Sequence, residues 1–476
     1  MGHPTIYPTG VTLYDPAKAW SGYTIFPAAD VGALLIDMNG TEVQLWKQLQ
    51  GFPNKLLPEG QVFGSTGLRD PDHGYQDQTD LVQVDWEGNI VWRFSQLEHI
   101  ADPGQEPRWY ARQHHDFQRE GNPVGYYVPD QMPMSRRGKT LLLVHEDVRN
   151  PNISEHLLLD DKFIEVSWEG EILWSWRAHE HFDELGFDDA AKRVLFRDPN
   201  LRKLAGGPTG DWLHINSASF VGPNRHFDTG DNRFHPDNII WDSREANIIA
   251  ITDRKTGYLV WRLGPNYDGS EAECKLGWII GQHHAHIIPR GLPGEGNLLV
   301  FDNGGWAGYG QPNPASPTGR QNARRDYSRV LEIDPISLKI VWQYTPAEAG
   351  FVMPLDASRF YSPFISSAQR LPNGNTLITE GSDGRIFEVT RDHELVWEYI
   401  SPYWGKRGLN MVYRAYRAPY DWVPQRQAPT ETPIPPLDRL QFRVQGAAQP
   451  GREREISVPG VEASQPDAAF CVAPSS

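Results

Sequence analysis

One pattern of apolar and polar residues recurs six times along the chain. Each copy starts with alternating apolar residues, continues through a polar turn, and ends with a β-rich stretch closed by tryptophan, as in LVQVDWEGNIVW. The closing tryptophans are Trp46, Trp92, Trp174, Trp261, Trp342 and Trp397. Glycine in turns such as Asn39-Gly40 and Glu87-Gly88 supplies the positive φ of a tight hairpin. Each copy is therefore predicted to be a β-hairpin with one buried face.

Further strands are predicted just before several of these hairpins, at residues 140–144, 297–301 and 375–378. A hairpin alone is only marginally stable, so two hairpins are expected to form a four-stranded sheet. Sheets of this kind arranged around an axis leave only short edges exposed. The sequence thus predicts an all-β fold: a six-bladed β-propeller with long inter-blade loops and a C-terminal extension. We expect the repeated tryptophans to pack between blades.

The composition changes after about Pro424, where QRQAPTETPIPPLDRL is rich in proline and is typical of an extended linker. We therefore expect a propeller domain over residues 1–424 that carries the catalytic site. Residues 425–476 are expected to form a Pro-rich linker and a C-terminal extension. Weak β character around residues 440–444 and 455–458 leaves two alternatives, a segment that straps onto the propeller or a partly disordered tail.

The charge of the chain limits its partners. The formal net charge is −16, which argues against a nucleic-acid partner and against an anionic membrane surface. An anionic small substrate is compatible with this charge if its pocket gathers positive side chains. The sequence leaves the oligomeric state open.

Location is inferred from the cysteines and the N-terminus. The two cysteines, Cys274 and Cys471, form no disulfide framework and no metal-binding motif. No secretory signal is visible in MGHPTIYPTGVTLYDP. We therefore expect a cytoplasmic protein, or a periplasmic one if a leader has been removed.

Histidine is the residue type that points to chemistry, because it serves as nucleophile, acid, base or metal ligand near neutral pH. The 16 histidines include three clusters, QHHDF at residues 113–117, WLHINS at 212–217 and QHHAH at 282–286. Each cluster precedes a predicted blade, and equivalent loops of a propeller point at one central channel. At least three of these histidines are therefore expected to converge.

The clusters allow two kinds of chemistry. His284 and His286, at positions i and i+2, share one face of an extended strand, as a pair of metal ligands would. Alternatively, histidines act as nucleophile and proton shuttle while arginine and asparagine hold an anion. A non-catalytic interaction platform would carry few histidines at the channel mouth, so the clusters argue against that class.

Several segments resemble the arylsulfotransferase family: QHHDF, WLHINSASF, IIWDSREANIIAITDRKTG, GQHHAHIIPRGLPGEGNLLVFDNG and YSPFISSAQRLPNGNTLI. The similarity runs from about Gly10 to Tyr399. Members of that family are bacterial six-bladed propeller enzymes that do not use PAPS. The resemblance implies a histidine nucleophile at His283, which takes a sulfuryl group from an aryl sulfate as sulfohistidine and passes it to a phenol. It implies no cofactor, and a small aromatic substrate as partner.

The resemblance also implies the remaining site residues. The HHD segment matches the family's histidine at either His114 or His115, and the HxN segment matches at His214, so all three join the catalytic set. The expected substrate-binding residues are Asn216, Arg244, His284, His286 and Ser366. Ser366 or Ser367 is expected to replace a family threonine that has no clear counterpart in FISSA.

The extra histidine in QHHAH keeps an alternative open. Strand alternation places His284 with His286 and leaves His283 on the opposite face. This pattern favours a divalent metal held by His284, His286, His214 and His115. The corresponding activity would be a metal-assisted hydrolase, lyase or isomerase acting on a small aromatic or lactone-like compound.

Overall fold

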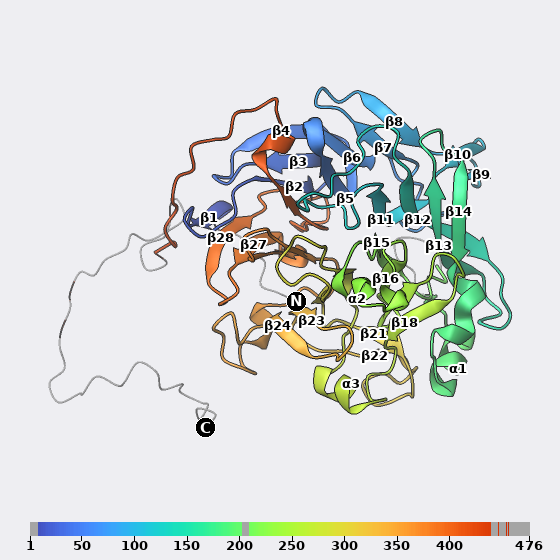
Figure 1. Ribbon diagram of the computed structural model, residues 1–476. Coiled ribbons are helices and arrows are strands. Elements are labelled where there is room, and N and C mark those ends of the chain that lie inside the picture. The colour runs from blue at the N-terminus through green and yellow to red at the C-terminus, as the bar shows by residue number, and fades with distance from the viewer. Residues whose placement is uncertain (1–7, 202–208, 439–445, 447–453, 455, 457–476) are drawn as a thin grey trace. The chain divides into compact units, whose positions relative to one another are not determined.

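The computed structural model describes residues 8–201 and 209–438, and the single residues 446, 454 and 456 (Figure 1). Cys471 and the C-terminal stretches predicted to have weak β character lie outside this part, apart from Ile456. The chain divides into two units, Met1–Pro435 and Pro436–Ser476. All helices and strands belong to the first unit.

Six antiparallel sheets are arranged around a common centre, as predicted, and form a six-bladed β-propeller (Figure 1). The first strand of each blade is the inner one, and neighbouring inner strands such as β11, β15, β19 and β25 contact one another in turn. Blade 1 contains β29 (Tyr416–Ala418), β2 (Tyr23–Ala28), β3 (Gly32–Ile36) and β4 (Glu42–Lys47); blade 2 contains β5 (Gln50–Leu57), β6 (Gln61–Ser65), β7 (Leu81–Val84) and β8 (Ile90–Phe94). Blade 3 contains β11 (Gln113–Arg119), β12 (Thr140–Val148), β13 (Leu158–Val166) and β14 (Ile172–Arg177); blade 4 contains β15 (Ile215–Phe220), β16 (Ile239–Ser243), β17 (Ile248–Thr252) and β18 (Leu259–Leu263). Blade 5 contains β19 (His283–Ile287), β20 (Leu298–Asp302), β23 (Arg329–Ile333) and β24 (Ile340–Tyr344); blade 6 contains β25 (Ser367–Arg370), β26 (Thr376–Glu380), β27 (Arg385–Val389), β28 (Leu395–Ile400) and β1 (Gly10–Tyr14).

Strands from both ends of the chain close the ring. The N-terminal strand β1 adds a fifth strand to blade 6 by pairing with β28. The late strand β29 becomes the inner strand of blade 1 by pairing with β2. Beyond β29, the backbone of Ile434 exchanges hydrogen bonds of 2.8 and 2.9 Å with Tyr14. The first residues of the predicted linker are therefore attached to the propeller.

Long loops carry the remaining elements. The loops between blades hold, as predicted, the hairpin β9 (Glu98–Ile100) with β10 (Arg108–Tyr110) and the helices α1 (Asp189–Arg197) and α3 (Glu271–Leu276). Helix α2 (Arg225–Asp228) instead lies in a loop within blade 4, and the hairpin β21 (Ala307–Tyr309) with β22 (Arg320–Ala323) lies in a loop within blade 5. Helix α1 begins after Asp188, whose side chain accepts a hydrogen bond from the Ala191 N–H. Within the described ranges, none of the helices has the length and apolar character needed to cross a membrane.

The repeated tryptophans lie on the outermost strand of each hairpin repeat and join neighbouring blades. Each indole Nε1–H donates to a backbone carbonyl in the next blade, at distances of 2.8 to 3.1 Å. The last of them, Trp397, donates to Met38 of blade 1 and completes the circle. The prediction that these tryptophans pack between blades is confirmed.

Three histidines at the inner strands have left-handed backbone conformations. The φ angles are 53° at His115, 52° at His214 and 58° at His284. Around each of them the register between the first and second strands of the blade shifts, as in a β-bulge. Left-handed backbone is uncommon for residues other than glycine, and bulges redirect side chains next to active sites. In QHHDF and QHHAH, which hold more than one histidine, the bulges therefore change which side chains face the centre.

Candidate active site

A cavity of about 1360 Å³ opens at the centre of the propeller. Three predicted catalytic histidines, His115, His214 and His283, line it together with Arg244. These residues come from blades 3, 4 and 5, so the predicted convergence of at least three histidines is confirmed.

His283 lines this cavity with a neutral imidazole whose unprotonated nitrogen is Nε2. Its Nδ1 lies 2.8 Å from Asn303 Oδ1 and 3.0 Å from the Gly281 carbonyl oxygen, and both of these atoms are acceptors. The ring proton is therefore on Nδ1, and Nε2 accepts a hydrogen bond of 3.2 Å from the Ile365 N–H. Burial, and then the charge of Arg244, lower the pKa of His283 well below its usual value. The imidazole is consequently neutral near pH 7, as a nucleophile must be.

Asn303 fixes this tautomer of His283. Its side-chain amide donates to two backbone carbonyl oxygens, at 2.6 and 2.8 Å, so its Oδ1 is the atom that faces the imidazole. An amide oxygen accepts the Nδ1 proton without removing it.

His214 is oriented by a carboxylate. The Nδ1 of His214 lies 2.5 Å from Asp211 Oδ2, which places the ring proton on Nδ1. Nε2 is then the nitrogen left to take up or release a proton in the cavity. A carboxylate that holds an imidazole in this way favours the imidazolium form when the ring gains a proton. The pair has the geometry of a general acid–base.

His115 lies beside His214, with 4.6 Å between the ring centroids. Its Nδ1 is 2.7 Å from the Nδ1 of His114, so one of these nitrogens donates to the other and His115 keeps Nε2 for the cavity. His114 does not line the cavity and stacks on His145 inside blade 3. The alternatives left by the sequence are thus separated: His115 faces the cavity and His114 faces the blade.

The cavity wall suits an aromatic anion. Five cationic residues line it, Arg244, Arg324, Arg325, Lys406 and Arg407, against the two acids Asp30 and Asp326. Arg244 is paired with Glu245, and Arg325 with Asp302 at 2.7 Å, so the positive charge that an anionic substrate requires comes mainly from Arg324, Lys406 and Arg407. Phe52 stacks on Tyr413 with ring centroids 4.2 Å apart and lies 4.4 Å from the His115 ring. Such a surface packs well against an aryl ring.

The sequence model of the arylsulfotransferase (ASST) family matches residues 130–400, more than half of the chain. The chain belongs to the arylsulfotransferase family. The matched range contains His214, Arg244 and His283, whereas His115 lies before it. Membership supports a transferase that acts in aryl sulfotransfer, with an aryl sulfate or phenol as substrate.

Other comparisons add little to this arylsulfotransferase assignment. No curated protein matches the sequence. Among solved structures, a protein of unknown function from Bacteroides caccae is 12% identical, with 84% of this chain and 99% of that chain covered and a TM-score of 0.40. A streptogramin B lyase is 10% identical (88% and 96% covered, TM-score 0.34), and the Dos1 propeller is 12% identical (82% and 73% covered, TM-score 0.32). TM-scores this low give no support for a shared substrate or reaction.

Two predicted substrate-binding residues do not line the arylsulfotransferase cavity. The buried Asn216 donates from Nδ2 to the carbonyl oxygen of Gln282, which directly precedes His283. The buried Ser366 donates to Ser362 Oγ and follows Ile365, whose N–H reaches His283. Both side chains therefore position the segments around His283 rather than contact the cavity.

His284 and His286 do not line the cavity. The bulge at His284 interrupts strand alternation: His283 pairs with Phe301 and His286 with Leu299, which share one face of the sheet. The prediction that His283 lies on the face opposite His286 is therefore wrong.

The ring centroids of His284 and His286 are 4.5 Å apart. Both Nδ1 atoms contact backbone carbonyl oxygens, while the Nε2 atoms contact the hydroxyls of Tyr416 and Tyr126 at 3.3 and 2.9 Å. The four histidines of the alternative metal site therefore do not converge, because His115 and His214 line the cavity whereas His284 and His286 do not.

Sequence reasoning missed several residues of the site. Asp211 stands three positions before His214, and Asn303 directly follows strand β20, but neither belongs to a histidine cluster. The cations Arg324, Arg325, Lys406 and Arg407 lie in loops without a repeating pattern. An Asp-x-x-His spacing next to a candidate histidine is the one signal that could have revealed Asp211.

A buried ionic cluster connects the inner strands. The Asp116 carboxylate contacts Lys55 Nζ at 2.6 Å and Arg414 Nη1 at 2.9 Å. Arg414 also donates to the Asn216 carbonyl oxygen. Burial alone would raise the pKa of Asp116, but the charges of Lys55 and Arg414 lower it. Lys55, Asp116 and Asn216 lie on the inner strands of blades 2, 3 and 4, and Arg414 lies just before β29, the inner strand of blade 1. The cluster therefore connects the inner strands of neighbouring blades.

The stability of the protein is expected to fall as the pH drops below about 6.5. Burial lowers the pKa of His283 and His284 well below the ordinary value, and that of His286 to about 4. The unfolded chain, with histidine pKa values near 6.5, then binds more protons than the folded protein, and each imidazole costs up to about 1.4 kcal/mol per pH unit. The contribution of these buried imidazoles to stability is fully present above pH 6.5 and is lost progressively below it. Urea unfolding at pH 7.5 and 5.5 measures the difference.

A His286→Gln variant provides the matched comparison for this pH dependence. Burial lowers the pKa of His114 and His115 in the same way, so His286 is one of five such imidazoles, and its removal should shrink their part of the fall in unfolding free energy between pH 7.5 and 5.5 by about one fifth. Equal stability of the wild type at both pH values would contradict the prediction.

Proposed function

We propose that this protein transfers a sulfuryl group from an aryl sulfate to a phenolic acceptor, without PAPS, through a sulfohistidine formed at His283. The observation that carries the proposal is the neutral His283 imidazole, which is unprotonated at Nε2 and lines a cavity together with Arg244, His115 and His214. Family membership supports the reaction class, and the cationic, aromatic cavity wall supports the substrate class.

In the first half-reaction, the aryl ring packs against Phe52 and Tyr413, and the sulfate lies toward Arg244. Nε2 of His283 attacks the sulfur, a nitrogen–sulfur bond forms, and the bond between sulfur and the phenolic oxygen breaks. The leaving oxygen takes the electron pair and receives a proton from His214, whose imidazolium form is stabilised by Asp211. Arg244 balances the charge on the sulfuryl oxygens.

Two contacts of His283 change during this step. The Ile365 N–H loses its acceptor when Nε2 binds sulfur and can then donate to a sulfuryl oxygen. The Nδ1–H of His283 continues to donate to Asn303 Oδ1, so this proton stays on the ring. The sulfated imidazole is therefore cationic and a good leaving group. In the second half-reaction, neutral His214 removes the proton of the acceptor phenol, the phenolic oxygen attacks sulfur, and the electron pair returns to Nε2.

The test is transfer from 4-nitrophenyl sulfate to phenol by the purified protein, with nitrophenolate absorbance and phenyl sulfate both measured. We expect sustained nitrophenolate release only when phenol is present, with no stimulation by PAPS. Initial rates at several donor and acceptor concentrations should give the parallel double-reciprocal lines of a ping-pong mechanism. Release that is independent of phenol, without phenyl sulfate formation, would contradict the proposal.

A further inference from the structure

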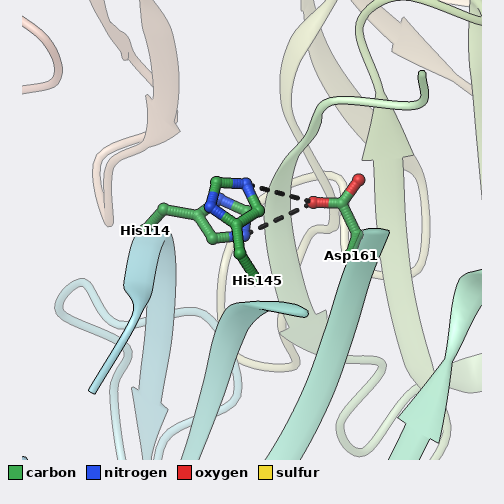
Figure 2. A group of neighbouring side chains, drawn as sticks. All are labelled: His114, His145 and Asp161. Atoms are coloured by element: carbon green, nitrogen blue, oxygen red, sulfur yellow. Dashed lines mark ion pairs between the residues drawn. The ribbon is translucent and has the colours of Figure 1, made fainter. Parts of the chain in front are cut away.

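A second group of chemically active side chains lies buried in blade 3, next to the cavity. It consists of His114 on β11, His145 on β12 and Asp161 on β13 (Figure 2). Asp161 Oδ1 is 3.4 Å from His114 Nε2 and 4.0 Å from His145 Nε2, and these three atoms all lie within 4.8 Å of one another. His145 and Asp161 are direct partners across the β12–β13 ladder, so the sheet itself fixes their separation.

The other polar atom of each side chain is already engaged. His145 Nδ1 lies 2.6 Å from Asp77 Oδ1, His114 Nδ1 lies 2.7 Å from the Nδ1 of His115, and Asp161 Oδ2 accepts from the Ile215 N–H at 2.9 Å. Of the three atoms that face one another, His114 Nε2 and Asp161 Oδ1 are buried and have no hydrogen-bond partner among the described residues. Buried polar atoms are rarely left in this state unless an ion or water completes them.

The surroundings resemble those of metal-binding imidazoles. A histidine ligand usually donates its second ring nitrogen to a carboxylate, which orients the ring and makes the coordinating nitrogen more basic. Asp77 has this relation to His145, and Asp77 is itself held by Arg69 and Arg112 at 3.1 and 2.8 Å. The structure already contains the outer partners that a metal site requires.

We propose that His114 Nε2, His145 Nε2 and Asp161 Oδ1 bind one divalent transition-metal ion. Two imidazole nitrogens and one carboxylate oxygen suit Zn²⁺ or Fe²⁺. Metal–ligand distances of about 2.0–2.2 Å in a tetrahedral site place ligand atoms about 3.3 Å apart. The His114–Asp161 distance already fits this value, and the His145–Asp161 distance requires a shift of less than about 1 Å. The two imidazoles stack with centroids 3.5 Å apart and planes 13° apart, so ion binding also requires the rings to tilt until both Nε2 electron pairs point at the ion.

The site would determine the protonation of a cavity histidine. With the ion on Nε2, His114 carries its proton on Nδ1 and donates it to the Nδ1 of His115. His115 then carries its own proton on Nε2, the nitrogen that remains for the cavity. The ion therefore makes His115 a hydrogen-bond donor toward a bound anion. Metal binding itself does not depend on the reaction proposed for the cavity.

The experiment is metal analysis of the purified full-length protein after chelation and reloading with Zn²⁺ or Co²⁺, followed by removal of excess ion. We expect about one bound ion per chain, with visible Co²⁺ absorption bands of nitrogen and oxygen ligands and none of thiolate. Asp161→Asn and His145→Ala should lose this ion, and Asp77→Asn should bind it about 10- to 100-fold more weakly.

His226→Ala is the matched control, because His226 is also buried but its Nε2 contacts only the Gly296 carbonyl oxygen at 2.9 Å. This control should keep the ion. Wild-type protein that binds no ion overturns the proposal, as does equal binding by Asp161→Asn and the control. If His145→Ala does not fold, wild-type stoichiometry and Asp161→Asn decide the question.

Discussion

Replacement of His283 by alanine is expected to lower sulfuryl transfer by about 10⁴-fold or more, because it removes the only proposed nucleophile. The variant should remain folded, since the imidazole contacts Asn303, a Gly281 carbonyl oxygen and one backbone N–H but carries no charge. Steady-state rates with 4-nitrophenyl sulfate and phenol measure the loss, and circular dichroism checks the fold.

The adjacent histidine supplies the matched control. His284 does not line the cavity, and both of its ring nitrogens contact other groups. His284→Gln should therefore keep kcat within about tenfold of the wild type. Free imidazole should partly restore activity to His283→Gly, where space for the ring is left. Full activity in His283→Ala, or its loss only in His284→Gln, would show that the nucleophile has been misassigned.

Asp116→Asn is expected to lower the free energy of unfolding by about 3–5 kcal/mol, because it leaves two buried cations without their shared anion. Lys55 and Arg414 are both buried and both contact the Asp116 carboxylate. Burial, offset in part by Asp116, lowers the pKa of Lys55 to about 8, so loss of the carboxylate should drive this lysine toward its neutral form. Urea denaturation near pH 7 measures the change.

The exposed pair between Lys18 and Glu394 offers the control for this prediction. Its side chains are 46% and 53% exposed, and solvent screens such pairs strongly. Glu394→Gln should leave the denaturation midpoint where it is. A similar midpoint shift in both variants would mean that the buried cluster does not stabilise the inner ring.

The sequence predicted the fold because the same physical requirement repeats. Each blade needs a hairpin and an indole that reaches its neighbour, so Trp46, Trp92 and their counterparts recur with the turns between them. The closing strands β1 and β29 were not predicted, since their partners are far away in sequence and neither carries the repeat. Long-range pairing of short strands leaves little local signal.

The candidate site was predicted less completely, for reasons that lie in backbone geometry. A bulge at His284 interrupts the alternation on which the placement of His283 relied, and a bulge at His115 decides which histidine of QHHDF faces the cavity. The resemblance brought Asn216 and Ser366 into the substrate-binding set, although they act through backbone groups of neighbouring segments.

The partners that hold the histidines could not be read from the chain. Asp211 and Asn303 orient His214 and His283 from outside the histidine clusters, in loops without a repeating pattern. Asp77 and Asp161 meet His145 and His114 only because three strands of blade 3 and the β6–β7 loop of blade 2 come together. Contacts of this kind depend on the folded structure rather than on local sequence.

The most direct test of the central claim is the mass of enzyme exposed to 4-nitrophenyl sulfate without acceptor, quenched at alkaline pH and digested. The mechanism predicts one added sulfuryl group on the peptide that contains His283, its disappearance when phenol is supplied before quenching, and no adduct in His283→Ala. A sulfuryl group on a different residue, or transfer that proceeds at full rate with no adduct on any peptide, would contradict the sulfohistidine mechanism.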